Sequence, residues 1–148
     1  MKKITIVLTA IVMLFATSSF AYDGTTINSA IKTAFQKNFI NATNVKWEKN
    51  SDFFLAYFDL NEKSITALYN ENGELMATSR VIEESQMPLS ISLAVAQKYS
   101  GYQLSSDVTE LSFEGQTNYY FIIKNEKRVL KLKCNANGEI SVEHKIKK

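Results

Sequence analysis

Two residue types that build metal and disulfide sites are almost missing from this chain. Its 148 residues include one cysteine, Cys134, and one histidine, His144. A single cysteine excludes an internal disulfide, and one residue of each type excludes multi-histidine and cysteine-rich metal sites. We therefore expect no metal and no other cofactor. Cys134 shares one side of an alternating run with Leu130 and Leu132, so we expect its thiol to be buried and unreactive.

Glycine is also scarce, and the chain shows none of the common catalytic or phosphate-binding motifs. The five glycines do not cluster, so the chain has no glycine-rich loop that could hold a phosphate. A repeated Asn-x-Asn-Gly lacks the carboxylates that a calcium loop needs at its first and last positions. A nucleophile–base pair of Cys134 and His144 is rejected because a thiol inside a sheet lacks the electropositive opening that activates it. We expect a protein that is not an enzyme.

The first 21 residues have the three parts of a secretory signal peptide. Lys2 and Lys3 precede an apolar run over residues 4–16, and Ser19-Phe20-Ala21 supplies a small-x-Ala cleavage pattern. The apolar run is shorter than the roughly 20 residues of a membrane-spanning helix. We predict cleavage before Tyr22, no membrane anchor, and a periplasmic or extracellular location for an exported bacterial protein.

The charge balance gives no evidence for a nucleic-acid partner. The whole chain has 17 basic and 15 acidic residues, and loss of Lys2 and Lys3 with the signal peptide makes the two counts equal. A protein that binds nucleic acid usually carries a clear excess of basic residues. We therefore expect no nucleic-acid partner.

A hexapeptide occurs twice and divides the mature chain into two halves. Residues 70–75 read Asn-Glu-Asn-Gly-Glu-Leu, and residues 135–140, which lie 65 positions later, read Asn-Ala-Asn-Gly-Glu-Ile. Asn-Gly between two β-rich runs predicts a hairpin with a type I′ turn, in which both central residues have positive φ. The repeat indicates a tandem duplication, with the signal peptide at 1–21, a first repeat at 22–86 and a second at 87–148.

Each half begins with an amphipathic helix and continues with β-strands. Apolar residues recur at helical spacing over 27–39, with Thr25 or Thr26 as N-cap, and over 91–99, with Pro88 at the first helical position and Gly101 at the end. β-type runs follow at 45–49, 53–60, 64–70 and 74–82, and then at 109–114, 118–124, 128–135 and 139–147. Their connections are too short for parallel crossovers. We predict an α+β fold of two units, each a helix plus a four-stranded antiparallel meander, which form one broad sheet with the helices on one face.

Alternation within the strands predicts which side chains face the helices. Trp47, the sole tryptophan, is expected to pack in the core. Ile140, Val142 and Ile146 of the last strand are expected on the core side, and His144 shares their parity. The rest of the predicted core face consists of Phe54, Ala56, Phe58, Ile65, Ala67, Tyr69, Tyr119, Phe121, Ile123, Leu130, Leu132 and Cys134.

The opposite face of the predicted sheet is unusually apolar. Phe53, Leu55 and Tyr57 in one half, with Tyr120 and Ile122 in the other, have the parity that points away from the helices. A sheet with helices on one side normally presents a polar face to water. Aromatic side chains on a rigid sheet suit a partner surface because they bury a large area and lose little rotamer entropy. We therefore take these five residues as the candidate partner-binding site, and cover by the other repeat's helix or by a second copy of the chain is the alternative.

Several short motifs resemble those of a known family. They are Val45-Lys46-Trp47-Glu48 before an aromatic strand, Asn-Gly-Glu before the fourth strand of each unit, and Met87-Pro88 at the start of the second helix. With the duplicated helix-plus-four-strand pattern, they resemble the PepSY-like family of exported bacterial proteins, also described as β-lactamase-inhibitor-protein-like. Met87 departs from the leucine that commonly precedes this proline. The resemblance implies two α-β4 repeats in a broad, mostly antiparallel sheet and a role in binding or inhibiting another protein.

Two functions remain open after these exclusions. The first is a secreted, non-enzymatic binding module that docks a protein partner through the aromatic sheet face, and such a partner could be a hydrolase that the module inhibits. The second is a small-ligand-binding or envelope-stress module that holds an apolar molecule between sheet and helices. Self-association through the same face is a further arrangement that the pattern allows.

Overall fold

The computed structural model describes residues 26–104 and 107–147. The predicted signal peptide at 1–21 therefore lies outside the described residues. The elements in chain order are α2 (Ser29–Asn38), β1 (Thr43–Asn50), β2 (Phe53–Leu60), β3 (Lys63–Asn70), β4 (Leu75–Ile82), the 3-10 helix η1 (Glu84–Gln86), α3 (Leu89–Lys98), β5 (Gln103–Leu104), β6 (Val108–Phe113), β7 (Gln116–Lys124), β8 (Arg128–Asn135) and β9 (Ile140–Lys147).

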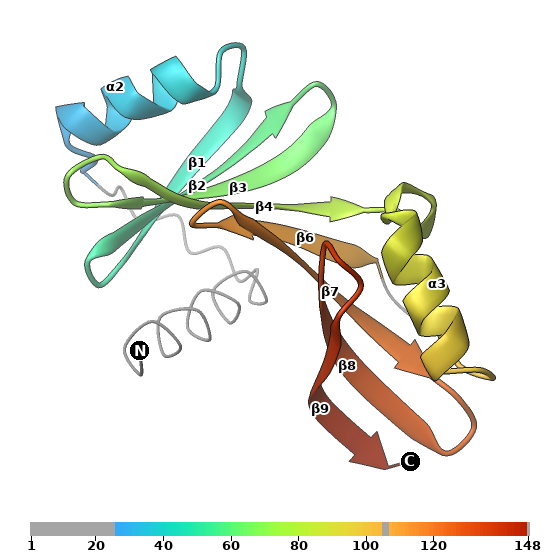
Figure 1. Cartoon of the computed structure of the whole chain (residues 1–148). Coiled ribbons are helices and arrows are strands. Elements are labelled where there is room, and N and C mark those ends of the chain that lie inside the picture. The colour runs from blue at the N-terminus through green and yellow to red at the C-terminus, as the bar shows by residue number, and fades with distance from the viewer. Residues whose placement is uncertain (1–25, 105–106, 148) are drawn as a thin grey trace.

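The strands form one antiparallel sheet, which confirms the predicted α+β class. The order across the sheet is β1-β2-β3-β4-β6-β7-β8-β9, and the short β5 pairs with β7 beside β6. The two halves join where β4 pairs with β6, from Ala77 opposite Phe113 to Ile82 opposite Val108. Figure 1 shows that the sheet bends between its two halves and that α2 and α3 both lie on the outer side of the bend. We call the face that carries the helices the outer face and the opposite one the inner face.

The outer face holds two separate cores, one beneath each helix. Under α2, Ile31 and Phe35 pack on β2 and β3, and the Phe35 ring lies 5.0 Å from the Phe58 ring. Trp47 packs against the same core, as predicted, with its ring 5.2 Å from that of Phe35. Under α3, Ile91 packs on β7 and β8. Fully burying one such side chain contributes about 1.5–3 kcal/mol to the stability of the fold. The residues predicted for the core face of β2, β3, β7 and β8 all pack in these two cores.

The helix starts differ slightly from the prediction. Asn28, rather than Thr25 or Thr26, is the N-cap of α2, and its side chain accepts a hydrogen bond of 2.9 Å from the Ile31 N–H. Pro88 is the residue before the first turn of α3 instead of the first helical residue. Asparagine is at least as good an N-cap as threonine, so residue type alone could not identify which residue caps α2.

The two Asn-Gly turns have positive φ at glycine, but they are not type I′ turns. Gly73 has φ +80° and Gly138 has φ +88°, whereas Asn72 and Asn137 do not have positive φ. In the first turn the Gly73 N–H donates to the Asn70 carbonyl at 3.1 Å, and the Asn70 N–H donates to the Glu74 carbonyl at 3.1 Å. This is the three-residue hairpin loop in which a type I turn ends on a left-handed glycine.

The side chain that begins each turn explains the difference. The Asn70 side-chain oxygen accepts from the N–H groups of Asn72 and Glu74, both at 3.0 Å. Asn135 accepts in the same way from Asn137 and Glu139, again at 3.0 Å. Asparagine at the first position therefore stabilises a type I turn through local side-chain bonds.

A β-bulge in β9 overturns one predicted face. Leu132 pairs with Val142 while the neighbouring Lys131 pairs with His144, so β9 has an extra residue, Glu143, at this point. An extra residue reverses the alternation beyond it. Val142 consequently shares the outer side with Leu132, and His144 and Ile146 lie on the inner side. The prediction that Ile146 and His144 share a face with Val142 is wrong.

Candidate functional site

The register across the central strands builds the inner face. Tyr57 lies opposite Thr66, Thr66 opposite Ser79, and Ser79 opposite Leu111, which lies opposite Asn118. Paired residues in a sheet point to the same side, and neighbours along a strand alternate. By this count the five predicted partner-binding residues, Phe53, Leu55, Tyr57, Tyr120 and Ile122, all lie on the inner face.

An apolar cluster occupies the middle of this face and crosses the junction between the halves. Unlike the outer face, which has one core per helix, the inner face gathers side chains from β2, β3, β4, β6 and β7 in a single group. Its buried members are Leu55, Leu68, Ala77, Leu111, Phe113 and Tyr120, and Phe53, Tyr57 and Met76 pack against them. We call this group the inner-face cluster.

The predicted residues differ in how accessible they are. Leu55 is 1% exposed and Tyr120 is 6% exposed, whereas Phe53, Tyr57 and Ile122 are half-buried. A partner surface would therefore meet the half-buried residues first. Leu55 and Tyr120 support them from beneath.

The sequence-based prediction of this face did not include the residues from β4 and β6. Ala77, Leu111 and Phe113 are buried members of the cluster, and Leu111 and Phe113 alternate with polar residues along β6. That alternation was a usable signal, since residues 109–113 read Thr-Glu-Leu-Ser-Phe. Their shared side became clear only from the pairing of β4 with β6, which joins residues about 30 positions apart.

Tyr120 is the one residue of the cluster with an unsatisfied polar atom. Within the described chain its hydroxyl is buried and has no hydrogen-bond partner, and the Lys133 ammonium lies 5.9 Å from its ring centroid. Burial, and secondarily the negative charge of Glu143, raises the pKa of Tyr120 to about 12. Leaving a buried hydroxyl unpaired costs roughly 1–3 kcal/mol, so the hydroxyl opposes folding here.

Tyr57 has a polar partner at the edge of the cluster. Its hydroxyl donates to the Glu48 carboxylate at 3.0 Å. Burial, the hydrogen bond to Glu48 and the charge of Glu48, in that order, raise the pKa of Tyr57 to about 12. The bond fixes the ring on the inner face next to β1.

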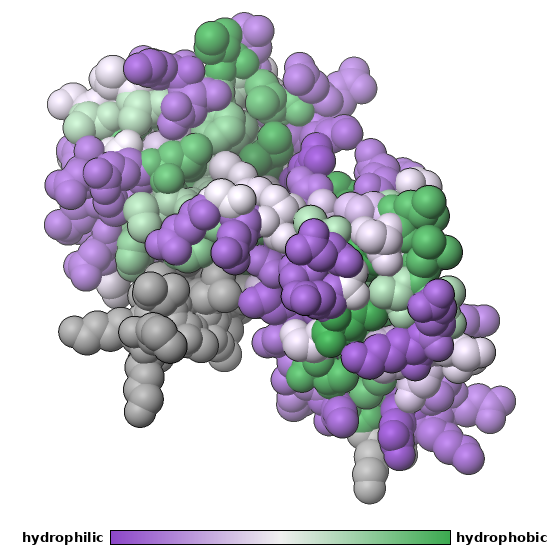
Figure 2. Space-filling view, viewed as in Figure 1, coloured by the Kyte–Doolittle hydropathy of each residue, from purple (hydrophilic) through white to green (hydrophobic). Residues whose placement is uncertain are grey.

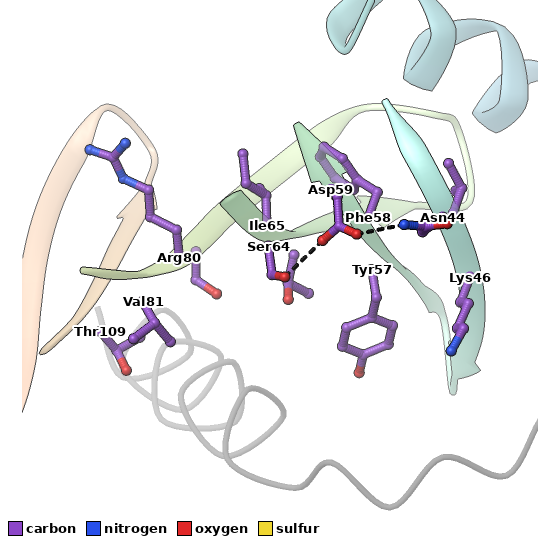
Figure 3. A pocket seen from close by; sticks show the side chains of 13 residues that line it. Asn44, Lys46, Tyr57, Phe58, Asp59, Ser64, Ile65, Arg80, Val81 and Thr109 are labelled. Carbon is purple, nitrogen blue, oxygen red and sulfur yellow. Dashed lines mark hydrogen bonds between the residues drawn. The ribbon is translucent and has the colours of Figure 1, made fainter. Parts of the chain in front are cut away.

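A hollow with a mixed polar and apolar lining lies beside the cluster on the same face. Strands β1, β2, β3, β4 and β6 border this space of about 740 Å³, whose lining includes Tyr57, Asp59, Ser79 and Thr109. Figure 3 shows that the side chains of Phe58, Ile65 and Arg80 point away from it, so these residues border it with their backbone.

Asp59 is held in place at the rim of the hollow. It accepts hydrogen bonds from the Asn44 amide at 2.8 Å and the Ser64 hydroxyl at 2.7 Å, the two dashed lines in Figure 3. Asn44 reaches it because β1 is irregular between Thr43 and Lys46 and Asn44 has φ +54°. The bonds from Asn44 and then Ser64, with a smaller contribution from the Lys46 charge, lower the pKa of Asp59. Asp59 is therefore ionised at neutral pH.

The outer face also carries exposed apolar residues. Leu89 is 72% exposed and Leu93 is 53% exposed, one helical turn apart on α3. Figure 2 shows apolar surface over α3 and a second apolar area in the upper half of the view, near α2. These two leucines provide a useful comparison for the inner face, because they are apolar, accessible and on the other side of the sheet.

The residues considered for catalysis do not come together. Cys134 is fully buried opposite Ile140, and His144 lies opposite Lys131 on the other face. Burial, followed by the charge of Glu139, raises the pKa of the Cys134 thiol. Among the described residues, no group of three or more His, Cys, Asp or Glu side chains is arranged to hold a metal ion. None of the described helices has the length and apolar character of a membrane span.

Similarity to known proteins is found at the level of structure. No model of a protein family matches the chain, and no curated protein matches it either. A BLIP-like protein from Bacteroides fragilis superposes with a TM-score of 0.68 at 20% identity, over 83% of this chain and 87% of that one. A protein from Bacteroides eggerthii that is provisionally described as a periplasmic protein gives a TM-score of 0.69 at 16% identity, over 83% of this chain and 90% of that one. A DUF2874 family protein from Bacteroides uniformis gives 0.68 at 17% identity, over 81% and 88%. The chain therefore has a BLIP-like fold.

Proposed function

We propose that this chain is an exported, non-enzymatic binding module that docks a protein partner through the inner face of its sheet. The observation that carries the proposal is the inner-face cluster. Six buried apolar side chains lie on the side of the sheet opposite both α2 and α3. In a sheet with helices on one side, the other side is normally polar, so an apolar face points to a contact.

The shape of the sheet favours a protein as the occupant. The bend between the halves places the inner face on the inside, so a convex surface could touch β2 and β7 together (Figure 1). Aromatic residues on a rigid sheet keep their positions before binding, which lowers the entropy lost on association. Phe53 and Tyr57 are the half-buried aromatics that would make the first contacts.

Family membership, duplication and export belong to the same proposal. The motifs at Trp47 and Met87-Pro88 support the PepSY-like assignment, and the matching hydrogen bonds of Asn70 and Asn135 support a tandem duplication. The pattern of the first 21 residues supports export to the periplasm or beyond. The name of one structural neighbour, a BLIP-like protein, supports inhibition of a hydrolase as one form of the function.

The non-enzymatic part of the proposal is supported by the position of the one candidate nucleophile. Cys134 is buried beneath α3 with a raised thiol pKa. A reactive cysteine needs a lowered pKa and access to substrate. The second function was expected between the sheet and the helices, where the two outer-face cores lie. The hollow lies on the inner face instead, and small-ligand binding is developed below for that different site.

The proposal is tested by comparing variants of the two faces in the native cell envelope. The inner-face variant is Tyr57→Ser with Ile122→Ser, and the matched control is Leu89→Ser with Leu93→Ser on α3. None of the four residues is fully buried, so each pair should cost about 2 kcal/mol or less in unfolding free energy. Each protein is tagged, recovered from the envelope, and examined for co-purified proteins and for its size in solution.

The expected result is one specific protein recovered with wild type and control but lost with the inner-face variant. The activity of a recovered hydrolase would then be assayed with and without the purified chain. Loss of the partner in the α3 variant alone would contradict docking through the inner face. If the inner-face variant instead changes from dimer to monomer, the face is self-associating and the foreign-partner proposal fails.

A further inference from the structure

The hollow on the inner face differs from the apolar cluster beside it because its apolar lining also carries several hydroxyl groups. Hydroxyl-bearing residues from three strands line it: Ser64 and Thr66 from β3, Ser79 from β4 and Thr109 from β6. Tyr57 and Val81 add apolar surface, and Val81 is 60% exposed. Its volume of about 740 Å³ falls within the usual range of small-molecule sites.

Three of the hydroxyls that line the hollow have no hydrogen-bond partner among the described residues. Within the described chain, no hydrogen bond joins the side chains of Thr66, Ser79 or Thr109 to another protein group. Ser79 as a whole residue is only 6% exposed, but Tyr120 carries the one fully buried side-chain polar atom without a partner in the described chain, so the Ser79 hydroxyl keeps access to the hollow. Each hydroxyl can donate one hydrogen bond and accept others. The hollow therefore presents mixed donors and acceptors on short side chains that the strands hold still.

The charges at the rim favour a neutral occupant. Lys46 and Asp59 both border the hollow and have opposite sign. Asp59 is already fixed by Asn44 and Ser64 and stays ionised, so it serves as an oriented acceptor. An anionic ligand would meet the Asp59 carboxylate, and a cationic one would meet Lys46. A purely apolar ligand would leave the hydroxyls of Thr66, Ser79 and Thr109 unpaired.

We propose that the hollow binds a neutral compound with several hydroxyl groups, of the size of a mono- or disaccharide. The ligand's hydroxyls would exchange hydrogen bonds with Thr66, Ser79, Thr109 and the Asp59 carboxylate. Its C–H surface would lie against Tyr57 and Val81. The proposal is distinct from protein docking, because it depends on the hydroxyl groups beside the cluster and needs no protein partner, although Tyr57 borders both sites.

The test is a ligand titration of the purified mature chain, monitored through the chemical shifts of its backbone amide NMR signals. The probes are methyl α-glucoside and cellobiose as neutral sugars, glucose 6-phosphate and glucosamine as charged ones, and cyclohexanol as an apolar one. The site variants are Thr66→Val and Thr109→Val, which remove a hydroxyl while keeping the branched shape. The matched control is Thr78→Val, since Thr78 is next to Ser79 on β4 but lies on the outer face.

We expect saturable shifts for at least one neutral sugar, confined to the strands around the hollow. Each site variant should weaken the binding of that sugar by roughly five-fold, which is the effect of one lost hydrogen bond. The control variant should bind it with unchanged affinity. Tighter binding of a charged probe, binding only of cyclohexanol, no saturable shift for either neutral sugar, or an equal loss in the Thr78→Val variant would overturn the proposal. None of these outcomes depends on whether a protein docks on the cluster.

Discussion

The contact between each Asn-Gly turn and its helix yields a prediction that compares three glycines. A Cβ at Gly73 would lie 3.1 Å from the backbone C and O of Ala30, and one at Gly138 would lie 3.0 Å from the backbone O of Ser90. Gly115 has a similar φ of +74° but nothing within 4 Å of its Cβ position. Alanine at Gly115 therefore measures the cost of left-handed backbone alone, and alanine at the other two adds a collision with a helix.

The expected magnitudes follow from these distances. Gly115→Ala should lower the unfolding free energy by about 1 kcal/mol, the usual cost of a side chain at positive φ. Gly73→Ala and Gly138→Ala should each lower it by about 2–4 kcal/mol, because overpacking adds roughly 1–3 kcal/mol. The turns must shift from the helices, which also strains the bonds from the Asn28 amide to the Glu71 carbonyl and from the Ser90 hydroxyl to the Ala136 carbonyl, both 3.0 Å.

The unfolding free energy of all three variants is measured by urea unfolding, monitored by far-UV circular dichroism. The dependence of this free energy on urea concentration should be the same in each variant. Fluorescence of Trp47, which packs in the core under α2, reports on the first half separately. Equal losses for Gly115→Ala and Gly73→Ala would show that the helix contact contributes nothing. A large loss at Gly73 but a small one at Gly138 would show that the two turns are not equivalent and would weaken the case for duplication.

Four further predictions concern individual side chains and one ion pair. Tyr120→Phe should leave stability unchanged or raise it by up to about 1 kcal/mol, because the lost hydroxyl has no partner; a loss above that in urea unfolding would mean that the hydroxyl is bonded. Since the pKa values of Tyr57 and Tyr120 are raised from 10.0 to about 12, stability should be full below about pH 10 and fall as the pH rises toward 12, less steeply in Tyr120→Phe. A double-mutant cycle on Arg80 and Glu110, which join β4 to β6 through a 2.7 Å ion pair, should give a coupling of roughly 0.5–1 kcal/mol, and a value near zero would remove the pair from the junction. Cys134 should react with a thiol reagent only as fast as the chain unfolds, since it is fully buried, and rapid labelling of the native protein would contradict this.

The sequence was sufficient to predict elements whose signals are local. Alternation along Leu130-Lys131-Leu132-Lys133-Cys134 predicted the side that faces α3, and that side is buried. The predicted strand runs agree with the observed strands to within about two residues at their ends. These elements follow from side-chain period alone, which each segment carries by itself.

Features that depend on competing local bonds were less predictable. Asn-Gly is typical of a type I′ turn, but the side chain of Asn70 two residues earlier stabilises a type I turn instead. The bulge at Glu143 reverses the faces of His144 and Ile146 without any clear sequence signal. The two-residue strand β5 pairs with β7 and was not predicted. In each case the local structure depends on a hydrogen bond, a bulge or a strand pairing that the alternation of side chains does not encode.

The candidate sites show the same limit. Parity within β2 and β7 was enough to place Tyr57 and Tyr120 on one face. It could not show that Leu111 and Phe113 complete the cluster, because that depends on the register of β4 with β6. The hollow draws residues from five strands, and no single segment of the sequence carries its pattern.

The most direct test of docking through the inner face is photo-crosslinking in the native envelope. A benzophenone amino acid replaces Tyr57, Ile122 or, as control, Leu93, and crosslinked products are identified by mass spectrometry after irradiation. We expect the same foreign protein to be attached at positions 57 and 122 and absent at position 93. Crosslinks to that protein only at position 93, or crosslinks at 57 and 122 only between copies of this chain, would contradict it.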